Sequence, residues 1–187
     1  MSDKKVGMMV AEGYEEIEML TVVDLLRRAG MTCDMISVTG KKELTSSHKV
    51  TVTADLLYEE ADFDSYDALA IPGGLPGTTN LGKHEGVCEQ LKKACAAGKL
   101  IAAICAAPTV FGKLGLLEGK KAICYPDMEE ELQAAGAVLT RDPAVRDGNI
   151  ITSRGMGTAI DFGLAIVAYY EGKEAAAGLA EKIVYEV

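Results

Sequence analysis

The sequence predicts an α/β fold in which a mostly parallel β-sheet carries helices on both faces. Short, nearly continuous apolar runs at 6–11, 67–71 and 100–104 are typical of strands that are buried on both sides. Longer segments with apolar residues at helical spacing separate these runs, and this alternation favours parallel pairing. With 187 residues and no linker-like tract, the simplest organisation is a single domain over 1–187.

The first half of the chain supplies most of the apolar runs. The helix after the first strand is indicated by Ile17, Leu20, Val23 and Leu26 at helical spacing. The segment rich in Thr and Val that follows favours a hairpin or an edge strand. In chain order we expect a strand at 6–11, a helix at 15–29, a strand at 32–38, a hairpin or edge strand at 43–57, a strand at 67–71, a helix at 85–97, a strand at 100–104 and a helical stretch ending at 116.

The second half repeats the alternation with shorter strands. An Asp-Gly sequence at 146–149 is typical of a tight turn. In chain order we expect a strand at 121–125, a helix at 128–135, a strand at 137–140, the Asp-Gly turn, a strand at 150–153 and helices at 159–170 and 174–181.

Charge and composition exclude several classes of partner. The net charge is -9 and the isoelectric point is near 4.8, which disfavours binding to nucleic acid or to an anionic membrane surface. The apolar run near the start is too short for a signal peptide, and no run approaches the length that spans a membrane. We therefore expect a cytoplasmic protein with reduced thiols.

The cysteines and histidines do not form a metal-binding or disulfide pattern. There are five cysteines, an odd number, and no pair has the CxxC spacing. The two histidines, His48 and His84, lie in loop-like segments without local partners. We expect neither of them to act as a general base, and we expect no metal and no other cofactor.

Cys105 is the best candidate for a reactive thiol. It directly follows the run at 100–104, and a helical stretch begins immediately after it. Such a strand-to-helix turn is sharp and needs small residues two positions before and after the nucleophile, where Ala103 and Ala107 stand. A helix N-terminus carries partial positive charge, so we expect this turn to favour the thiolate. The alternative is an inert cysteine buried at a strand end.

Glu18 is the candidate partner of that thiol. It lies among apolar residues near the start of the first helix. A carboxyl group held against apolar neighbours has a raised pKa and can donate a proton. The alternative is simple placement of acidic residues, with Glu15 and Glu16, at the positive end of a helix.

Other strand ends carry residues that suit a ligand. Gly73 and Gly74 follow the strand at 67–71, where their backbone N–H groups could face an oxyanion or form a plain turn. No phosphate-binding glycine motif follows a strand, so a nucleotide cofactor lacks support. Arg154 faces either an anion or a dimer partner, or it is an ordinary strand-end arginine. Cys124 also ends a strand and could approach the same sheet edge.

Four motifs stand in a distinctive order over nearly the whole chain. They are AEGYEEIEML, ALAIPGGLPGTTNL, LIAAICAAPTV and ITSRGMGTAIDFGLAIV. In this order and spacing the chain resembles the DJ-1/PfpI (ThiJ) superfamily, and most closely its DJ-1/YajL branch. The resemblance implies a flavodoxin-like three-layer α/β sandwich that forms a homodimer.

The resemblance also implies roles for individual residues. The family's reactive cysteine matches Cys105, and the protonated glutamate that hydrogen-bonds its sulfur matches Glu18. The backbone amides of the family's oxyanion pocket match Gly74 and Ala106, and the arginine of its strand-end motif matches Arg154.

One position departs from the family pattern. Where the family has a histidine that approaches the cysteine, the stretch AICYPDME places Tyr125. Tyrosine has a far higher reference pKa than histidine, so it donates a hydrogen bond but is a poor base at neutral pH. A mechanism that requires that histidine therefore lacks support, whereas one that uses Cys105 and Glu18 does not. We expect Tyr125, with Gly73, to lie near the substrate.

The resemblance implies an enzyme of reactive-aldehyde defence, and two alternatives remain. The favoured function is a glutathione-independent glyoxalase or a protein deglycase, whose substrate is a small 2-oxoaldehyde or a glycated adduct. One alternative is a redox sensor or chaperone in which Cys105 oxidises to a sulfinate held by protonated Glu18. The other is a PfpI-like peptidase, which loses its base because Ala106 stands where those members have a histidine.

Overall fold

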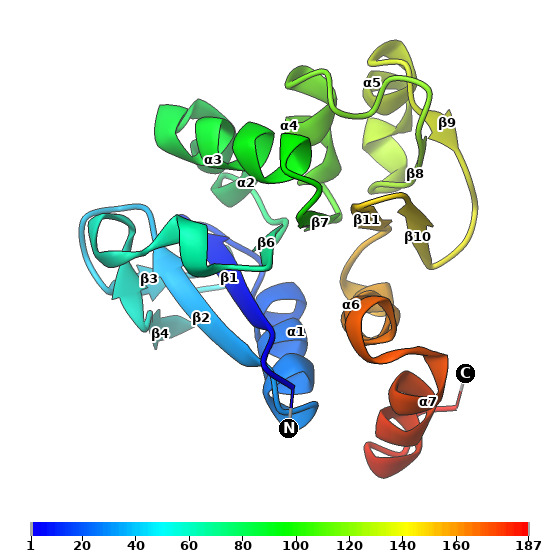
Figure 1. The fold of residues 1–187 in the computed structure, drawn as a ribbon. Helices are drawn as coiled ribbons and strands as arrows, with labels where there is room; N and C mark the ends of the chain where they lie inside the picture. The colour runs from blue at the N-terminus through cyan, green and yellow to red at the C-terminus, as the bar shows by residue number, and fades with distance from the viewer. Residues whose placement is uncertain (1, 187) are drawn as a thin grey trace.

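A seven-stranded sheet forms the centre of the molecule, and the computed structural model describes residues 2–186 (Figure 1). Across the sheet the strands are β10 (Ala144–Asp147), β11 (Ile150–Ser153), β7 (Leu100–Ile104), β6 (Ala68–Ile71), β1 (Lys5–Val10), β2 (Thr32–Ser37) and β5 (Leu56–Leu57). Neighbouring strands pair in parallel from β11 through β5, and β10 pairs antiparallel with β11 at one edge.

Helices cover both faces of this sheet, as Figure 1 shows. On one face lie α1 (Glu16–Arg28), α6 (Ala159–Glu171) and α7 (Lys173–Lys182). On the other face lie α2 (Gly77–Lys83), α3 (Glu85–Ala96), α4 (Pro108–Lys113) and α5 (Glu129–Ala134). Two separate apolar clusters, one for each face, fill the space between sheet and helices. The predicted three-layer α/β sandwich is therefore confirmed.

The order of the strands opens a crevice at the carboxyl edge of the sheet. β1 and β6 are neighbours in the sheet, but the chain leaves β1 toward α1 on one face and leaves β6 toward α2 on the opposite face. Connections that diverge in this way leave a gap beyond the strand ends, which is where parallel α/β folds bind ligands. The segment after β7 enters the same edge, because β7 pairs with β6.

Helix α1 forms where it is predicted, and Val23 and Leu26 of the predicted apolar stripe are buried, but its first predicted member is not. Ile17 is 46% exposed, whereas Met19, Val22 and Leu26 are fully buried against the sheet. Glu18, Val22 and Leu26 follow one another at i, i+4 and i+8 and so share one stripe of the helix. The stripe that packs on the core thus also carries the Glu18 carboxyl inward.

Helix α2 is absent from the sequence prediction. Its sequence, GTTNLGK, contains glycine, threonine and asparagine, which have low helix propensity. Packing determines its conformation instead, because Leu81 is fully buried and Gly77 lies directly against the backbone of Gly13 and Tyr14. The added Cβ of any other residue at Gly77 would meet that backbone at 2.7–2.8 Å.

The strand predicted at 121–125 is largely wrong. Only Lys121–Ala122 form a strand, β8, which pairs with β9 (Val138–Leu139) in a small separate sheet. The segment then turns, and the Tyr125 N–H donates a hydrogen bond of 2.7 Å to the carbonyl of Cys105. That bond brings Tyr125 to the end of β7 rather than into a strand.

The hairpin predicted within 43–57 is confirmed in its first part. β3 (Glu43–Thr45) and β4 (Thr51–Thr53) form an antiparallel two-stranded sheet of their own. The turn between them contains Ser46 and His48, and the Ser46 N–H donates to the Val50 carbonyl at 2.8 Å. Over residues 2–186, helices that are both long and apolar enough to cross a bilayer are lacking.

Candidate active site around Cys105

Cys105 lies on a strained turn between β7 and α4. Its φ angle is +64°, in the left-handed region that a non-glycine residue adopts at a cost of about 1–3 kcal/mol. Hydrogen bonds from neighbouring segments hold the turn: the Cys105 N–H donates to the Ser153 carbonyl at 3.0 Å, and the Cys105 carbonyl accepts from Tyr125. Ala103 and Ala107 are fully buried on either side, so the close packing that requires small residues is present.

The Glu18 carboxyl lies behind the Cys105 sulfur. Glu18 is only 1% exposed, and its Oε2 accepts a hydrogen bond of 2.9 Å from the Gly73 N–H. Its other oxygen, Oε1, is buried and has no nitrogen or oxygen partner among residues 2–186. The Cys105 thiol is the hydrogen-bonding group that adjoins this carboxyl, so a single proton can be shared between them.

Burial raises the pKa of Glu18 to about 7, and the negative charge of Glu15 adds to the effect. Hydrogen bonds from Cys105 and from the Gly73 N–H oppose it. The expected rise in the Glu18 pKa is therefore present, and its cause is the removal of the carboxylate from water. At neutral pH the group is poised between its acid and base forms, as a proton carrier requires.

Burial opposes the expected preference of the helix N-terminus for the Cys105 thiolate. Burial raises the pKa of Cys105 to about 12, and the charge of Glu18 and its hydrogen bond to the thiol raise it further. Helix α4 begins only at Pro108 and is short, so its dipole is weak. The backbone N–H groups of Ala106 and Gly74 act in the opposite direction and lower the thiol pKa.

The two raised pKa values describe one coupled pair. When the shared proton moves from Cys105 to Glu18, the carboxylate charge that opposes the thiolate disappears. The Ala106 and Gly74 N–H groups then face a thiolate that a neutral carboxyl group also hydrogen-bonds. The geometry thus supplies a route to the reactive thiolate that does not need a histidine.

The Glu18 burial predicts a specific pH dependence of stability. The folded protein keeps a proton that the unfolded chain releases between the ordinary carboxyl pKa of 4.5 and the raised value of about 7, so stability falls as pH rises through this window. Above this pH window, the burial of Glu18 lowers the free energy of unfolding by the full amount, about 3 kcal/mol. We expect Glu18→Gln to gain stability relative to wild type from about pH 4 to about pH 8, measured by urea unfolding.

A matched control for this measurement is Glu174→Gln, since Glu174 is exposed on α7. Its stability difference from wild type should not depend on pH over the same window. If the stability difference between Glu18→Gln and wild type also does not change with pH, then Glu18 ionises normally in the folded protein.

A hollow of about 360 Å³ lies in front of the Cys105 sulfur. Four of the predicted site residues line it, namely Gly74, Cys105, Ala106 and Tyr125. Gly73 and Glu18 do not reach the hollow and lie behind the sulfur, where they hold the carboxyl. The remaining lining residues are Glu15, Ser47, His48, Leu75, Asp127 and Met128.

His48 is the residue that the sequence prediction dismissed and the structure brings to the site. It lines the hollow, and its Nδ1 lies 3.2 Å from Glu16 Oε2, so the expectation of no local partner is wrong. His84 also has a partner, because its Nδ1 accepts the Val87 N–H and caps α3. The His48–Glu16 contact joins residues 32 positions apart, so the sequence pattern carried no signal for it, whereas the His84 contact is a local helix cap.

Glu15, Glu16 and His48 form a group that could hold a metal ion. Each offers one ligand atom, and these atoms all lie within 4.8 Å of one another. Glu15 already accepts the Glu18 N–H at 2.7 Å as the N-cap of α1, and Glu16 accepts from His48. These hydrogen bonds give the three side chains a role without a metal.

Comparison with known proteins identifies the family. The profile of the DJ-1/PfpI family matches residues 4–169. The chain belongs to the DJ-1/PfpI family. Among its members, protein dj-1beta of Drosophila melanogaster is 37% identical over 171 residues, which cover 91% of each protein. Protein DJ-1 homolog B of Arabidopsis thaliana is 40% identical over 166 residues, which cover 88% of this chain but 37% of that protein.

Solved structures of DJ-1 proteins share the architecture. The crystal structure of Drosophila melanogaster DJ-1beta superposes with a TM-score of 0.94 at 35% identity and covers 100% of both chains. Oxidized Toxoplasma gondii DJ-1 superposes with a TM-score of 0.93 at 36% identity, over 98% of this chain and 100% of that one. The chain spans 37% and 44% of the two Arabidopsis relatives, DJ-1 homologs B and A, so it corresponds to part of those proteins.

Two other residues from the DJ-1/PfpI motifs and strand ends lie outside the hollow. Arg154 is not among the described residues that line it, and its Nε is buried without a hydrogen-bond partner in residues 2–186. Cys124 is fully buried, and its thiol donates to the Tyr125 carbonyl at 3.4 Å. Burial raises the pKa of Cys124 to about 12, and its full burial, unlike the half-exposed setting of Cys105, keeps reagents away from the thiol.

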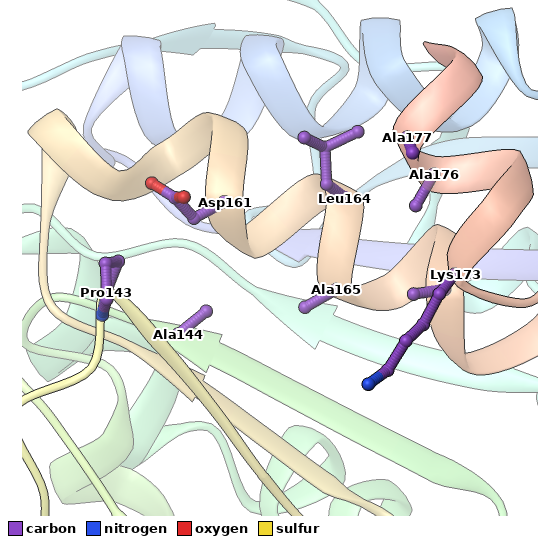
Figure 2. Close-up of a pocket in the computed structure, with 9 residues that line it drawn as sticks. Pro143, Ala144, Asp161, Leu164, Ala165, Lys173, Ala176 and Ala177 are labelled. Carbon is purple, nitrogen blue, oxygen red and sulfur yellow. The ribbon is translucent and has the colours of Figure 1, made fainter. Parts of the chain in front are cut away.

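A second hollow, of about 340 Å³, lies far from this chemistry, between β10, α6 and α7 (Figure 2). Figure 2 shows small apolar side chains on the facing helices, with Asp161 and Lys173 toward its ends. Asp161 already accepts a hydrogen bond of 2.9 Å from the Tyr185 hydroxyl. Its described lining contains neither cysteine nor histidine, so the hollow at Cys105 is the better candidate for catalysis in this DJ-1/PfpI protein.

Proposed function

We propose that this protein is a cysteine-dependent enzyme that converts small 2-oxoaldehydes to 2-hydroxy acids, as a glutathione-independent glyoxalase. The supporting observation is the arrangement at Cys105, where the thiol faces a hollow of about 360 Å³ with the Glu18 carboxyl behind it. Backbone N–H groups of Gly74 and Ala106 point at the same sulfur. A glycated adduct would enter by the same chemistry, and the related deglycase activity is a variant of this proposal.

The first step is addition of the thiol to the aldehyde. Cys105 transfers its proton to Glu18, and the thiolate attacks the aldehyde carbon, so that a carbon–sulfur bond forms and the carbonyl π electrons move to oxygen. The N–H groups of Gly74 and Ala106 stabilise that oxyanion, which then takes up a proton to give a hemithioacetal.

The second step moves a proton between the two carbons of the substrate. Once the oxyanion has taken back the proton that Glu18 received from the thiol, the Glu18 carboxylate removes the proton from the former aldehyde carbon. The electrons shift to the neighbouring carbonyl oxygen, and the proton of the hydroxyl group on the former aldehyde carbon passes to that oxygen. Glu18 returns the proton to that neighbouring carbon, which gives a 2-hydroxyacyl thioester on Cys105. Hydrolysis of the thioester by water releases the 2-hydroxy acid and restores the thiol.

The charge of the hollow favours an uncharged substrate. The acidic lining residues are Glu15 and Asp127, and the described lining contains neither lysine nor arginine. Acidic side chains around the hollow repel an anionic ligand. A neutral 2-oxoaldehyde such as methylglyoxal or glyoxal fits this setting better than an oxo acid does.

The test is a panel of three compounds of similar size: methylglyoxal, glyoxal and glyoxylate. We expect the wild-type protein to form lactate and glycolate from the first two. Glyoxylate lacks the second carbonyl that the proton shift requires, so it serves as an inhibitor, with a Ki at least about tenfold higher than the KM for methylglyoxal. Product acids are quantified by NMR, and protein alkylated with iodoacetamide serves as the blank. Failure of both aldehydes to yield acid above that blank would overturn the proposed function.

The second candidate function is that of a redox sensor, and the same wild-type protein can distinguish it from the enzyme. The oxidised state of Toxoplasma gondii DJ-1 and the half-buried Cys105 beside the Glu18 carboxyl support it. In that case mild peroxide adds two oxygens to Cys105, seen by intact mass, while no aldehyde is turned over. Acid formation from methylglyoxal favours the enzyme instead.

A further inference from the structure

The proposed mechanism leaves the hydrolysis of the thioester without a base. His48 lines the hollow in which that hydrolysis takes place. The last step requires a water molecule to lose a proton as it attacks the thioester on Cys105. Glu18 adjoins a substrate that is already bonded to the sulfur, but it is 1% exposed and lies behind that sulfur, so a water molecule entering through the hollow does not reach it. Tyr125 lines the hollow, but tyrosine is a poor base at neutral pH. His48 lines the hollow and its side chain is 68% exposed, so water reaches both the imidazole and the sulfur.

Glu16 orients the His48 ring. Its carboxylate is 12% exposed and lies 3.2 Å from His48 Nδ1. Burial acts to raise the pKa of Glu16, but hydrogen bonds from its own backbone N–H, from His48 and from Ser46 outweigh it and lower that pKa. An ionised Glu16 accepts the proton of Nδ1, which leaves the lone pair of His48 on Nε2.

The turn that carries His48 is fixed to the body of the protein. The Ser46 hydroxyl accepts the N–H groups of His48 and Val50 at 3.3 and 3.0 Å. The Ser47 N–H donates to the Tyr14 carbonyl at 2.8 Å, immediately before the start of α1. These bonds hold the exposed imidazole beside the hollow. Among the described residues, none forms a hydrogen bond with its Nε2.

We propose that His48 is the general base for hydrolysis of the thioester, with Glu16 as its positioning residue. Nε2 takes a proton from water as the water oxygen bonds to the acyl carbon, and the carbon–sulfur bond breaks when the tetrahedral intermediate collapses. The proton then passes from imidazolium to the departing thiolate, so that the acid and the free thiol are released. This inference rests on the proposed function, because it concerns the acyl group which that function places on Cys105.

His48→Gln is the direct test, since glutamine keeps a hydrogen-bonding group for Glu16 but cannot act as a base. We expect kcat for methylglyoxal to fall at least about a hundredfold. KM should fall with it, and kcat/KM should stay within about twofold, because kcat/KM reports only the steps up to the thioester. Glu16→Gln should change kcat and KM in the same direction by a smaller factor.

Trapping of the acyl enzyme provides a readout that loss of structure would not mimic. Hydroxylamine added during turnover converts a lactoyl thioester to lactohydroxamate, which is quantified by mass spectrometry. We expect the trapped fraction to rise in His48→Gln and Glu16→Gln. His84→Asn, which removes the other imidazole but keeps a residue suited to capping α3, should match the wild type. EDTA in every assay keeps metal ions away from Glu15, Glu16 and His48.

The outcomes separate this inference from the proposed function. Lactate formation by wild type with an unchanged kcat in His48→Gln would overturn the role of His48 alone. A fall in kcat with an equal fall in kcat/KM and no trapped acyl group would also overturn it. If wild type forms no lactate at all, the proposed function fails first and the hydrolysis step fails with it.

Discussion

Replacing Cys105 with alanine is expected to lower the rate of lactate formation from methylglyoxal by at least about a thousandfold. The thiol is the only group at the hollow that the mechanism uses to bond the substrate, and neither Glu18 nor the backbone N–H groups can replace it. The rate is measured as lactate produced at saturating methylglyoxal, with far-UV circular dichroism to verify folding. Cys105→Ala should fold normally, because the sulfur that it removes is only half-buried and its loss leaves no closed cavity.

The matched control is Cys88→Ala, at another free and incompletely buried cysteine. Its thiol contacts the Gly82 carbonyl at 3.4 Å on the α2–α3 side of the molecule, and it does not line the hollow at Cys105. Its rate should equal that of wild type. Wild-type turnover in Cys105→Ala would show that the aldehyde reacts elsewhere.

Gly73→Ala is expected to damage both stability and activity, although it adds a single methyl group. The added Cβ would lie 2.5 Å from Glu18 Oε2, 2.6 Å from Cys105 Cβ and 3.0 Å from the Ile104 carbonyl. Glu18 and Cys105 cannot both keep their positions around it. We expect a loss of about 1–3 kcal/mol of unfolding free energy, and a fall in kcat of about a hundredfold from the displaced thiol–carboxyl pair.

Thermal unfolding and lactate formation measure the two effects, and Gly157→Ala is the control. An added Cβ at Gly157 has no atom within 4 Å. At this chain length each kcal/mol corresponds to about 2–4 °C in Tm, so the difference between the variants is resolved easily. If Gly73→Ala and Gly157→Ala have the same Tm and the same rate of lactate formation, the close approach of Glu18 and Cys105 around Gly73 does not matter for stability or activity.

Features set by local sequence were predictable. The apolar runs gave the strands at 6–11, 67–71 and 100–104, because strands buried on both faces must be apolar throughout. The small residues around Cys105 indicated its turn, although hydrogen bonds with the distant residues Ser153 and Tyr125 hold it in place. The family resemblance supplied Glu18, whose role a lone carboxyl among apolar residues could only suggest.

Features set by distant contacts were not predictable. α2 forms through packing against the segment after β1, and the shortened β8 follows from a hydrogen bond between Tyr125 and Cys105. His48 reaches the hollow through a turn whose partners lie at the start of α1. The high pKa of Cys105 depends on burial of the thiol and then on the charge of Glu18, both of which a helix-dipole argument omits. The homodimer, the cytoplasmic location and the single-domain organisation stay predictions.

The hydrogen bond from Cys105 to Ser153 has a consequence for biosynthesis. The carbonyl that steadies the strained turn belongs to β11, which is synthesised after the other described strands of the sheet. A nascent or truncated chain that lacks β11 cannot hold Cys105 in its left-handed conformation, however well the earlier strands have paired. The thiol therefore acquires this geometry only after β11 has been synthesised and has paired with β7.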